Sequence, residues 1–219
     1  KTITVLQEAA NEKLRAASKN GNNEEVKKLI EYKANVNATE ANRPGLGALH
    51  LAAQQRHTDI VRTLIEHKAG VNLMGHNGQT ALHVAAGRGH VNVVRTLIEL
   101  KAEANLGDND HWTAAHTAAW NGHNDVLQVL IESGADINAK TKKEYISPKN
   151  GLNYSANSTA LDIAKIAKKK PRANHQEYDE VISTLERAAL RAAAGRGDYA
   201  EVKRLIEKKI DVNSPDTKG

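Results

Sequence analysis

A six-residue phrase recurs along this chain at a fixed spacing. It reads ALHLAA at residues 48–53, ALHVAA at 81–86 and AAHTAA at 114–119, each copy 33 residues after the last. A fixed period in this range predicts stacked supersecondary units, each of which packs only on its neighbours. Because such a stack presents an extended surface, the pattern favours binding over catalysis.

Each unit is predicted to fold as two short helices followed by an extended loop, as the unit that begins at Asn77 illustrates. Asn77 and Gly78 form a turn signal, because both residue types accept a positive φ. Thr80 can cap a first helix, whose apolar residues over 82–86 share one helical face. A second apolar stripe with the same spacing over 93–98 predicts the second helix, and an extended finger then leads to the next unit.

These units resemble ankyrin repeats. The family's Thr-Pro-Leu-His-x-Ala-Ala phrase appears at 80–86 as TALHVAA, its Gly-His turn as Gly89-His90, and its exit phrase at 134–138 as GADIN. The resemblance covers nearly the whole chain and implies an all-α ankyrin-repeat solenoid of helix-turn-helix units with β-hairpin-like finger loops. The chain departs from the family in lacking proline at the helix starts, and in carrying Arg56 where the next two units have glycine.

Two insertions interrupt the short period in the second half of the chain. The first predicts an extended finger over 140–157, and the second, over 168–177, separates the two helices of the fifth unit. Pro171 lies in this second insertion and cannot continue a helix interior. The closing helix of the fifth unit is therefore expected from Tyr178 to Leu185.

A longer repeat is superimposed on the short one, at an offset of 176 residues. Residues 14–17 and 190–193 both read LRAA, and no finger precedes the second copy. We therefore expect residues 1–185 to form one cluster of five units. Residues 186–219 are expected to form either the first unit of a second cluster, which is the favoured alternative, or a C-terminal capping repeat.

The composition excludes several classes of protein. The sequence contains no cysteine, which removes disulfides, thiolate metal sites and cysteine nucleophiles. No apolar run approaches the roughly 20 residues that span a bilayer. The formal net charge of +5 favours an acidic partner, but it lacks the density of a dedicated nucleic-acid binder. We expect a monomer located inside the cell, in the cytoplasm or the nucleus.

The ten histidines suggest a metal site, but the repeat explains most of them. Six fall at two positions of the unit, so equivalent residues stack one repeat apart and do not converge on one point. These are His50, His83 and His116 at one position, and His57, His90 and His123 at the other. In the ankyrin family such residues hydrogen bond to turns and neighbouring units. Because the sequence also has no H-E-x-x-H, no G-x-S-x-G and no glycine-rich phosphate loop, we expect no metal, no cofactor and no enzymatic activity.

Two basic stretches lie in or beside the insertions, over 140–149 and 165–172. A nuclear-import peptide, a site for anionic lipid and a nucleic-acid contact are the functional alternatives. We favour solvated loops, because clustered charges are readily accommodated in water. Nucleic acid is disfavoured as a partner, because only Tyr145 and Tyr154 come close to supplying aromatic rings for stacking.

Both tryptophans of the chain fall in one repeat. Trp112 lies at the base of a finger, and Trp120 lies near the end of the first helix of the same unit. The equivalent positions of the two preceding units carry glutamine, leucine or glycine, so the stack itself does not require tryptophan. A pair of tryptophans on a concave face predicts a binding hot spot. The alternative is that one of them packs under the long finger over 140–157.

In the ankyrin family the fingers and first helices line the concave face that recognises partners, which implies a candidate site around the two tryptophans. The residues expected there are Arg43, Gln54, Gln55, Met74, His76, Arg88, Asp108, Asp110, His111, Trp112, Trp120 and Asn121. Because this surface has mixed polarity, we expect a protein or peptide partner and a non-catalytic protein–protein interaction scaffold. The alternative function is the targeting or substrate-recruitment region of a larger enzyme or host-directed effector.

Overall fold

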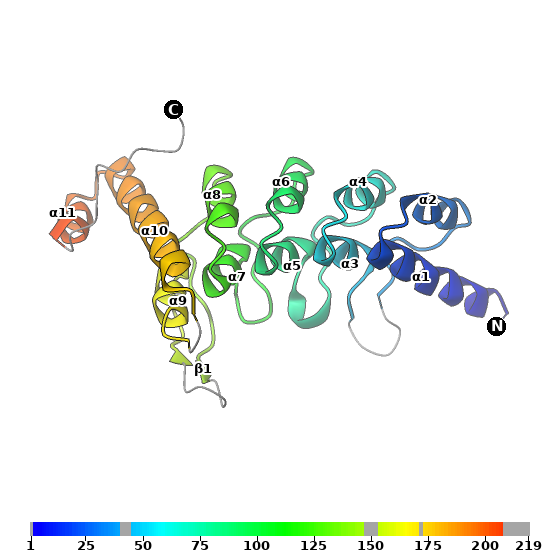
Figure 1. Ribbon diagram of the computed structural model, residues 1–219, viewed down its shortest axis with the longest axis horizontal. Helices are drawn as coiled ribbons and strands as arrows, with labels where there is room; N and C mark the ends of the chain where they lie inside the picture. The colour runs from blue at the N-terminus through cyan, green and yellow to red at the C-terminus, as the bar shows by residue number, and fades with distance from the viewer. Residues whose placement is uncertain (1, 40–44, 147–152, 171–172, 208–219) are drawn as a thin grey trace.

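The computed structural model describes residues 2–39, 45–146, 153–170 and 173–207 of this chain. Pairs of helices stand side by side in one elongated row, from α1 at one end to α11 at the other (Figure 1). The fingers extend from the same side of the row, beneath the first helix of each pair (Figure 1). The predicted all-α solenoid of helix-turn-helix units is therefore confirmed.

The helix bounds follow the repeat. The pairs are α1 (Thr2–Asn20) with α2 (Asn23–Glu31), α3 (Ala48–Gln54) with α4 (Thr58–Glu66), α5 (Ala81–Gly87) with α6 (Val91–Glu99), α7 (Ala114–Asn121) with α8 (Asn124–Glu132), and α9 (Ala160–Ala167) with α10 (His175–Gly195), followed by α11 (Tyr199–Glu207). A short 3₁₀ helix, η1 (His76–Gly78), lies in one finger. In the long finger, strands β1 (Tyr145–Ile146) and β2 (Asn153–Tyr154) pair antiparallel, with Tyr145 opposite Tyr154.

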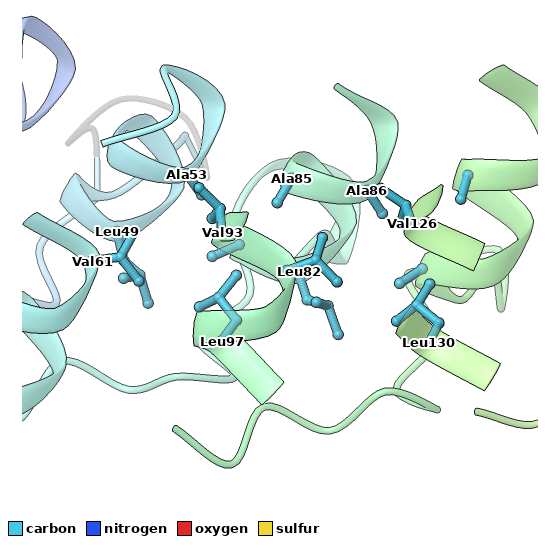
Figure 2. Packing of buried hydrophobic residues seen from close by; sticks show 14 of the residues in the cluster. Leu49, Ala53, Val61, Leu82, Ala85, Ala86, Val93, Leu97, Val126 and Leu130 are labelled. Atoms are coloured by element: carbon cyan, nitrogen blue, oxygen red, sulfur yellow. The ribbon is translucent and has the colours of Figure 1, made fainter. Parts of the chain in front are cut away.

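The core is one band of aliphatic side chains that runs through the stack. Leu82, Leu97 and Leu130 belong to a continuous layer that crosses from one unit to the next (Figure 2), and each is at most 1 % exposed. Alanines such as Ala85 and Ala118 are fully buried on the first helices, so that α3, α5, α7 and α9 contact one another in sequence. Since each unit closes its apolar face against a neighbour, the stability of the stack depends on nearest-neighbour contacts.

The turn between the two helices of a unit needs a left-handed backbone. Gly89 has φ of +70°, and a Cβ atom there would lie 2.9 Å from Nδ1 of His123 in the next unit. Arg56 stands at the equivalent position and has φ of 66°. Arg56 therefore adopts the conformation that glycine favours, which is strained for a residue with a side chain.

The closing helix of the fifth unit differs from its predicted bounds. It was expected from Tyr178 to Leu185, whereas α10 begins at His175 and continues without a break to Gly195. The apolar stripe begins only at Tyr178, so periodicity cannot detect the polar first turn that precedes it. The first part of α10 buries Val181 and Leu185 in the main core, while Ala193 packs with Leu205 of α11 in a second cluster. The division into a five-unit cluster and a following unit stays a prediction, although one helix contributes to both core clusters.

Candidate functional site

One set of histidines fixes the fingers. Nδ1 of His83 accepts a hydrogen bond from the backbone N–H of Thr80 at 3.2 Å, which leaves Nε2 to donate to the carbonyl of Trp112 at 2.8 Å. His50 and His116 bond in the same way to the carbonyls of Gln79 and Ser158, at 3.0 and 3.1 Å. Burial lowers the pKa of all three imidazoles, so the neutral form is favoured. Each histidine thus joins the first helix of its own unit to the base of the next finger.

A second set of histidines fixes the ends of the first helices. Nε2 of His90 lies 3.0 Å from the carbonyl of Gln54, and Nε2 of His123 lies 3.2 Å from the carbonyl of Gly87, in each case one unit earlier. His57 makes the same contact with the carbonyl of Lys19 at 3.1 Å. The predicted structural role of these six histidines, in turns and between units, is confirmed.

The two tryptophans form an aromatic cluster with a third ring. The ring centroids of Trp112 and Trp120 are 6.1 Å apart, with the planes at 75°. Tyr154, from strand β2 of the long finger, lies 5.2 Å from Trp112 and 6.4 Å from Trp120. Both indoles remain partly exposed, whereas Tyr154 is 8 % exposed. Both tryptophans thus contact the long finger through Tyr154, but neither is covered by it completely.

Lys170, in the insertion before α10, and Tyr178, near the start of α10, also contact Trp120. The hydroxyl of Tyr178 donates to the backbone carbonyl of Trp120 at 2.7 Å, and the ammonium of Lys170 donates to the same oxygen. Nζ of Lys170 also lies 3.8 Å from the centroid of the Trp120 ring, in a cation–π contact. Burial lowers the pKa of Lys170 to about 8. Since Trp120 occupies the position of Gly87 in the preceding unit, Tyr178 and Lys170 replace a turn histidine at this contact.

The aromatic cluster borders an open cavity of about 370 Å³. Its lining residues are Gln79, Asp108, Asp110, Trp112, Thr117, Trp120, Asn121 and Tyr154. A second cavity of about 370 Å³ is lined by Leu46, Gln54, His76, Gln79, His83, Val84, Gly87, Arg88 and Thr117. Because Gln79 and Thr117 line both, the two cavities are adjacent, and we refer to them together as the finger groove.

The acidic residues of the groove come from the base of the finger before α7. Oδ1 of Asp108 accepts hydrogen bonds from the backbone N–H groups of Asp110 and Trp112, both at 2.9 Å. Oδ1 of Asp110 lies 2.7 Å from the ammonium of Lys143. In the part of the chain that the structure describes, the buried indole nitrogen of Trp112 has no hydrogen-bond partner. The two carboxylates are therefore bonded to the backbone of their own finger or paired with Lys143.

The comparison with protein families agrees with this architecture. A family model described as "Ankyrin repeats (3 copies)" matches residues 13–107 and 67–141, which together span more than half of the chain. The chain belongs to the ankyrin-repeat family. Repeats of this family are generally protein–protein interaction modules and are typically non-catalytic. A comparison with curated proteins gave no match.

The described residues of this ankyrin-repeat protein can also be compared with the requirements of a membrane span and of a metal site. Among the described helices, none combines the length and the apolar character needed to cross a membrane. Within the described ranges, no group of three or more histidine and carboxylate side chains is placed to hold a metal ion. The finger groove is the candidate site that agrees with the general role of the family.

The structure brings together most of the residues expected at the site. The finger groove includes Gln54, His76, Arg88, Asp108, Asp110, Trp112, Trp120 and Asn121. Gln55, Met74 and His111 are exposed but do not line either cavity. Arg43 lies outside the described residues.

Seven lining residues of the finger groove are not among those expected from the sequence. Leu46, His83, Val84 and Gly87 line only the second cavity, whereas Gln79, Thr117 and Tyr154 line the first. Gln79 could have been inferred from the repeat, because it lies 33 residues before Trp112. Thr117 could have been inferred from helical spacing, because it lies three and four residues before Trp120 and Asn121 on α7. Tyr154 lies in an insertion that has no counterpart in the other units, so the period gives no register for it. Only its aromatic character, close in sequence to the tryptophan repeat, could have suggested a place in the cluster.

Proposed function

We propose that this ankyrin-repeat protein is a non-catalytic recognition module that binds a segment of another protein in the finger groove, with Trp112 and Trp120 as the anchors. The observation that carries the proposal is the placement of both tryptophans beside an open cavity of about 370 Å³. Neither position requires an aromatic residue for stacking, because the preceding units carry other residue types there.

The contacts around the two tryptophans support a binding role. Trp120 is held by its contacts with Tyr154, Lys170 and Tyr178, and Trp112 is held by Tyr154 and by the hydrogen bond from His83 to its carbonyl. Side chains that are ordered before binding lose little conformational entropy when a partner arrives. Indoles that are partly exposed can also bury a large apolar area when a partner binds, which is typical of interface hot spots.

A random-peptide library displayed on phage tests the proposal with a defined probe. Peptides selected on the wild-type protein are synthesised, and their affinities are measured by calorimetry for the wild type and for Trp120→Ala. We expect the affinity to fall at least tenfold, as is usual for truncation of a hot-spot tryptophan. Tyr199→Ala is the matched control, because Tyr199 is an aromatic residue on α11 that is 85 % exposed and lies outside the groove.

A second variant separates binding from folding. Thr117 lines both cavities and is partly exposed, so Thr117→Arg introduces a long side chain into the groove without removing the aromatic cluster. We expect this variant to keep its melting temperature within a few degrees and to lose peptide binding. Selected peptides that bind Trp120→Ala and Thr117→Arg as tightly as the wild type would show that the groove is not the binding site.

A further inference from the structure

The charge inside the first cavity of the groove differs in sign from the charge of the whole chain. The chain carries a formal net charge of +5. The described residues that line this cavity nevertheless include Asp108 and Asp110 and no lysine, arginine or histidine. The nearest base that contacts them is Lys143, which pairs with Asp110. The local charge therefore suits a cationic group, whatever the overall charge attracts at long range.

The two carboxylates differ in how firmly they are held. Asp108 accepts two backbone N–H bonds at 2.9 Å, so its orientation at the base of the finger is fixed. The side chains of Asp110 and Lys143 are 44 and 66 % accessible, although Oδ1 of Asp110, the oxygen that lies nearest the ammonium, is buried. Ion pairs between accessible side chains contribute little free energy of stabilisation. An incoming cation can therefore displace Lys143 from Asp110 at a small cost in free energy. Asp110 is thus the carboxylate available to a partner.

The aromatic part of the cavity suits a flat cation. The faces of indole and phenol rings attract positive charge, and this protein already places the ammonium of Lys170 over Trp120. Lys170 is not among the residues that line the cavity, and the partly exposed ring of Trp112 borders it. A guanidinium group is planar, stacks on aromatic faces and is weakly hydrated, whereas an ammonium group is compact and strongly hydrated.

Building on the proposed function, we propose that the first cavity of the finger groove binds an arginine side chain of the partner protein. The guanidinium stacks against the aromatic cluster and donates hydrogen bonds to the carboxylate of Asp110, replacing the ammonium of Lys143. A planar fork of five N–H donors matches a carboxylate better than an ammonium does. Because the cavity holds about 370 Å³, it has room for the side chain and its neighbouring backbone.

The two tryptophans provide the measurement, because they are the only two in the chain and both border the cavity. The protein is labelled with ¹⁵N, and the two indole N–H signals are followed while the peptide acetyl-Gly-Arg-Gly-amide is added up to tens of millimolar. We expect saturable shifts of both signals. The citrulline peptide, which keeps the shape and loses the charge, should bind at least fivefold more weakly, and the lysine peptide should fall between the two.

Two variants are expected to act in opposite directions. Asp110→Asn removes the carboxylate and should weaken arginine binding three- to tenfold, whereas Lys143→Gln removes the competing cation and should strengthen it two- to fivefold. Asp125→Asn is the matched control for the first variant, because Asp125 is an exposed aspartate on α8 outside the groove. A thermal melt of each variant verifies that it is folded.

Each of the other outcomes overturns the arginine proposal. The first is the absence of a saturable shift with the arginine peptide, and the second is equal binding of the citrulline peptide. The third is preferential binding of acetyl-Gly-Glu-Gly-amide, with the effects of Asp110→Asn and Lys143→Gln reversed in sign. The last result would identify an acidic partner instead. Library-selected peptides that depend on Trp120 but contain no essential arginine would defeat this inference and leave the proposed function intact. Selected peptides that ignore Trp120 would defeat the proposed function itself.

Discussion

The contact between the third and fourth units and the contact between the fourth and fifth units use different side chains for the same purpose. In the first, His123 bonds to the carbonyl of Gly87 near the end of α5. In the second, Tyr178 and Lys170 bond to the carbonyl of Trp120 near the end of α7. The helix end must have its carbonyl satisfied, but several donors can do so. This freedom allows the insertion before α10 to supply a cation that also covers the Trp120 ring.

The residue that caps the start of the first helix also differs between the units. In the second, third and fourth units a histidine caps the helix start and reaches the next finger, as His83 does toward Trp112. In the fifth unit Asp162 caps the start by accepting from the N–H and hydroxyl of Thr159, at 3.0 and 2.8 Å. No finger follows the fifth unit, because α10 continues as one helix to Gly195. A histidine at this position would have no finger carbonyl for its second ring nitrogen to contact. The carboxylate of Asp162 is therefore sufficient to cap the helix.

The largest expected effect concerns the regular units. Leu97 is fully buried in the continuous core, so Leu97→Ala should lower the free energy of unfolding by about 2–5 kcal/mol. Urea denaturation followed by circular dichroism measures the change. Leu6→Ala is the control, because Leu6 is 67 % exposed and its truncation should change stability by less than about 0.5 kcal/mol. Equal midpoints for Leu97→Ala and the wild type would contradict the packing described for α6.

The next effect tests the histidine contacts. His83→Gln should destabilise the protein by about 1–3 kcal/mol at neutral pH, because it disturbs a buried bond to the carbonyl of Trp112. Since burial lowers the folded-state pKa of His83 below 6.5, the unfolded chain binds more protons as the pH falls through this range. The stability contributed by the neutral imidazole is therefore complete above about pH 6.5 and is lost below it.

The pH dependence provides the measurement for this variant. The wild type should lose stability between pH 7.5 and 5.5, with contributions from His50, His83 and His116, and His83→Gln should lose less over the same interval. Thermal melts at the two pH values measure both slopes. A wild-type melting temperature that does not change with pH would mean that these imidazoles are not buried in their neutral form.

A smaller effect tests the contact that replaces the histidine. Tyr178→Phe removes the hydroxyl that donates to the Trp120 carbonyl and keeps the ring, so the expected loss is about 0.5–1.5 kcal/mol. The emission of the two tryptophans should also change, because Trp120 loses one of its restraints. Tyr199→Phe serves as the control, since Tyr199 is 85 % exposed. An unaltered stability would indicate that Lys170 alone satisfies this carbonyl.

The smallest effect concerns the turn in which the second unit departs from its neighbours. Arg56→Gly should stabilise the protein by about 0.5–1 kcal/mol, because glycine adopts the left-handed conformation at this position without strain. Gly89→Ala should have the opposite sign, since its Cβ would approach Nδ1 of His123 to 2.9 Å. Differential scanning calorimetry detects both shifts. A destabilised Arg56→Gly would mean that the arginine side chain makes a compensating contact.

What could be predicted from the sequence depends on whether a residue has a counterpart one period away. His83 and Trp120 lie inside the 33-residue pattern, so their unit, helix and side of the stack follow from alignment with their neighbours. Tyr154 and Lys170 lie in insertions, where no equivalent residue reports their position. Their contacts with Trp120 arise from three-dimensional closure of the insertions onto α7, which local propensity does not encode.

The continuity of α10 has a mechanical consequence. A helix of 21 residues is about 32 Å long, and its backbone bonds resist bending along the whole of that length. One part of α10 is anchored beside α8 and α9, while its far end carries α11. A force applied at α11 would therefore be transmitted along α10 to its first turns, where Tyr178 contacts Trp120 of the aromatic cluster.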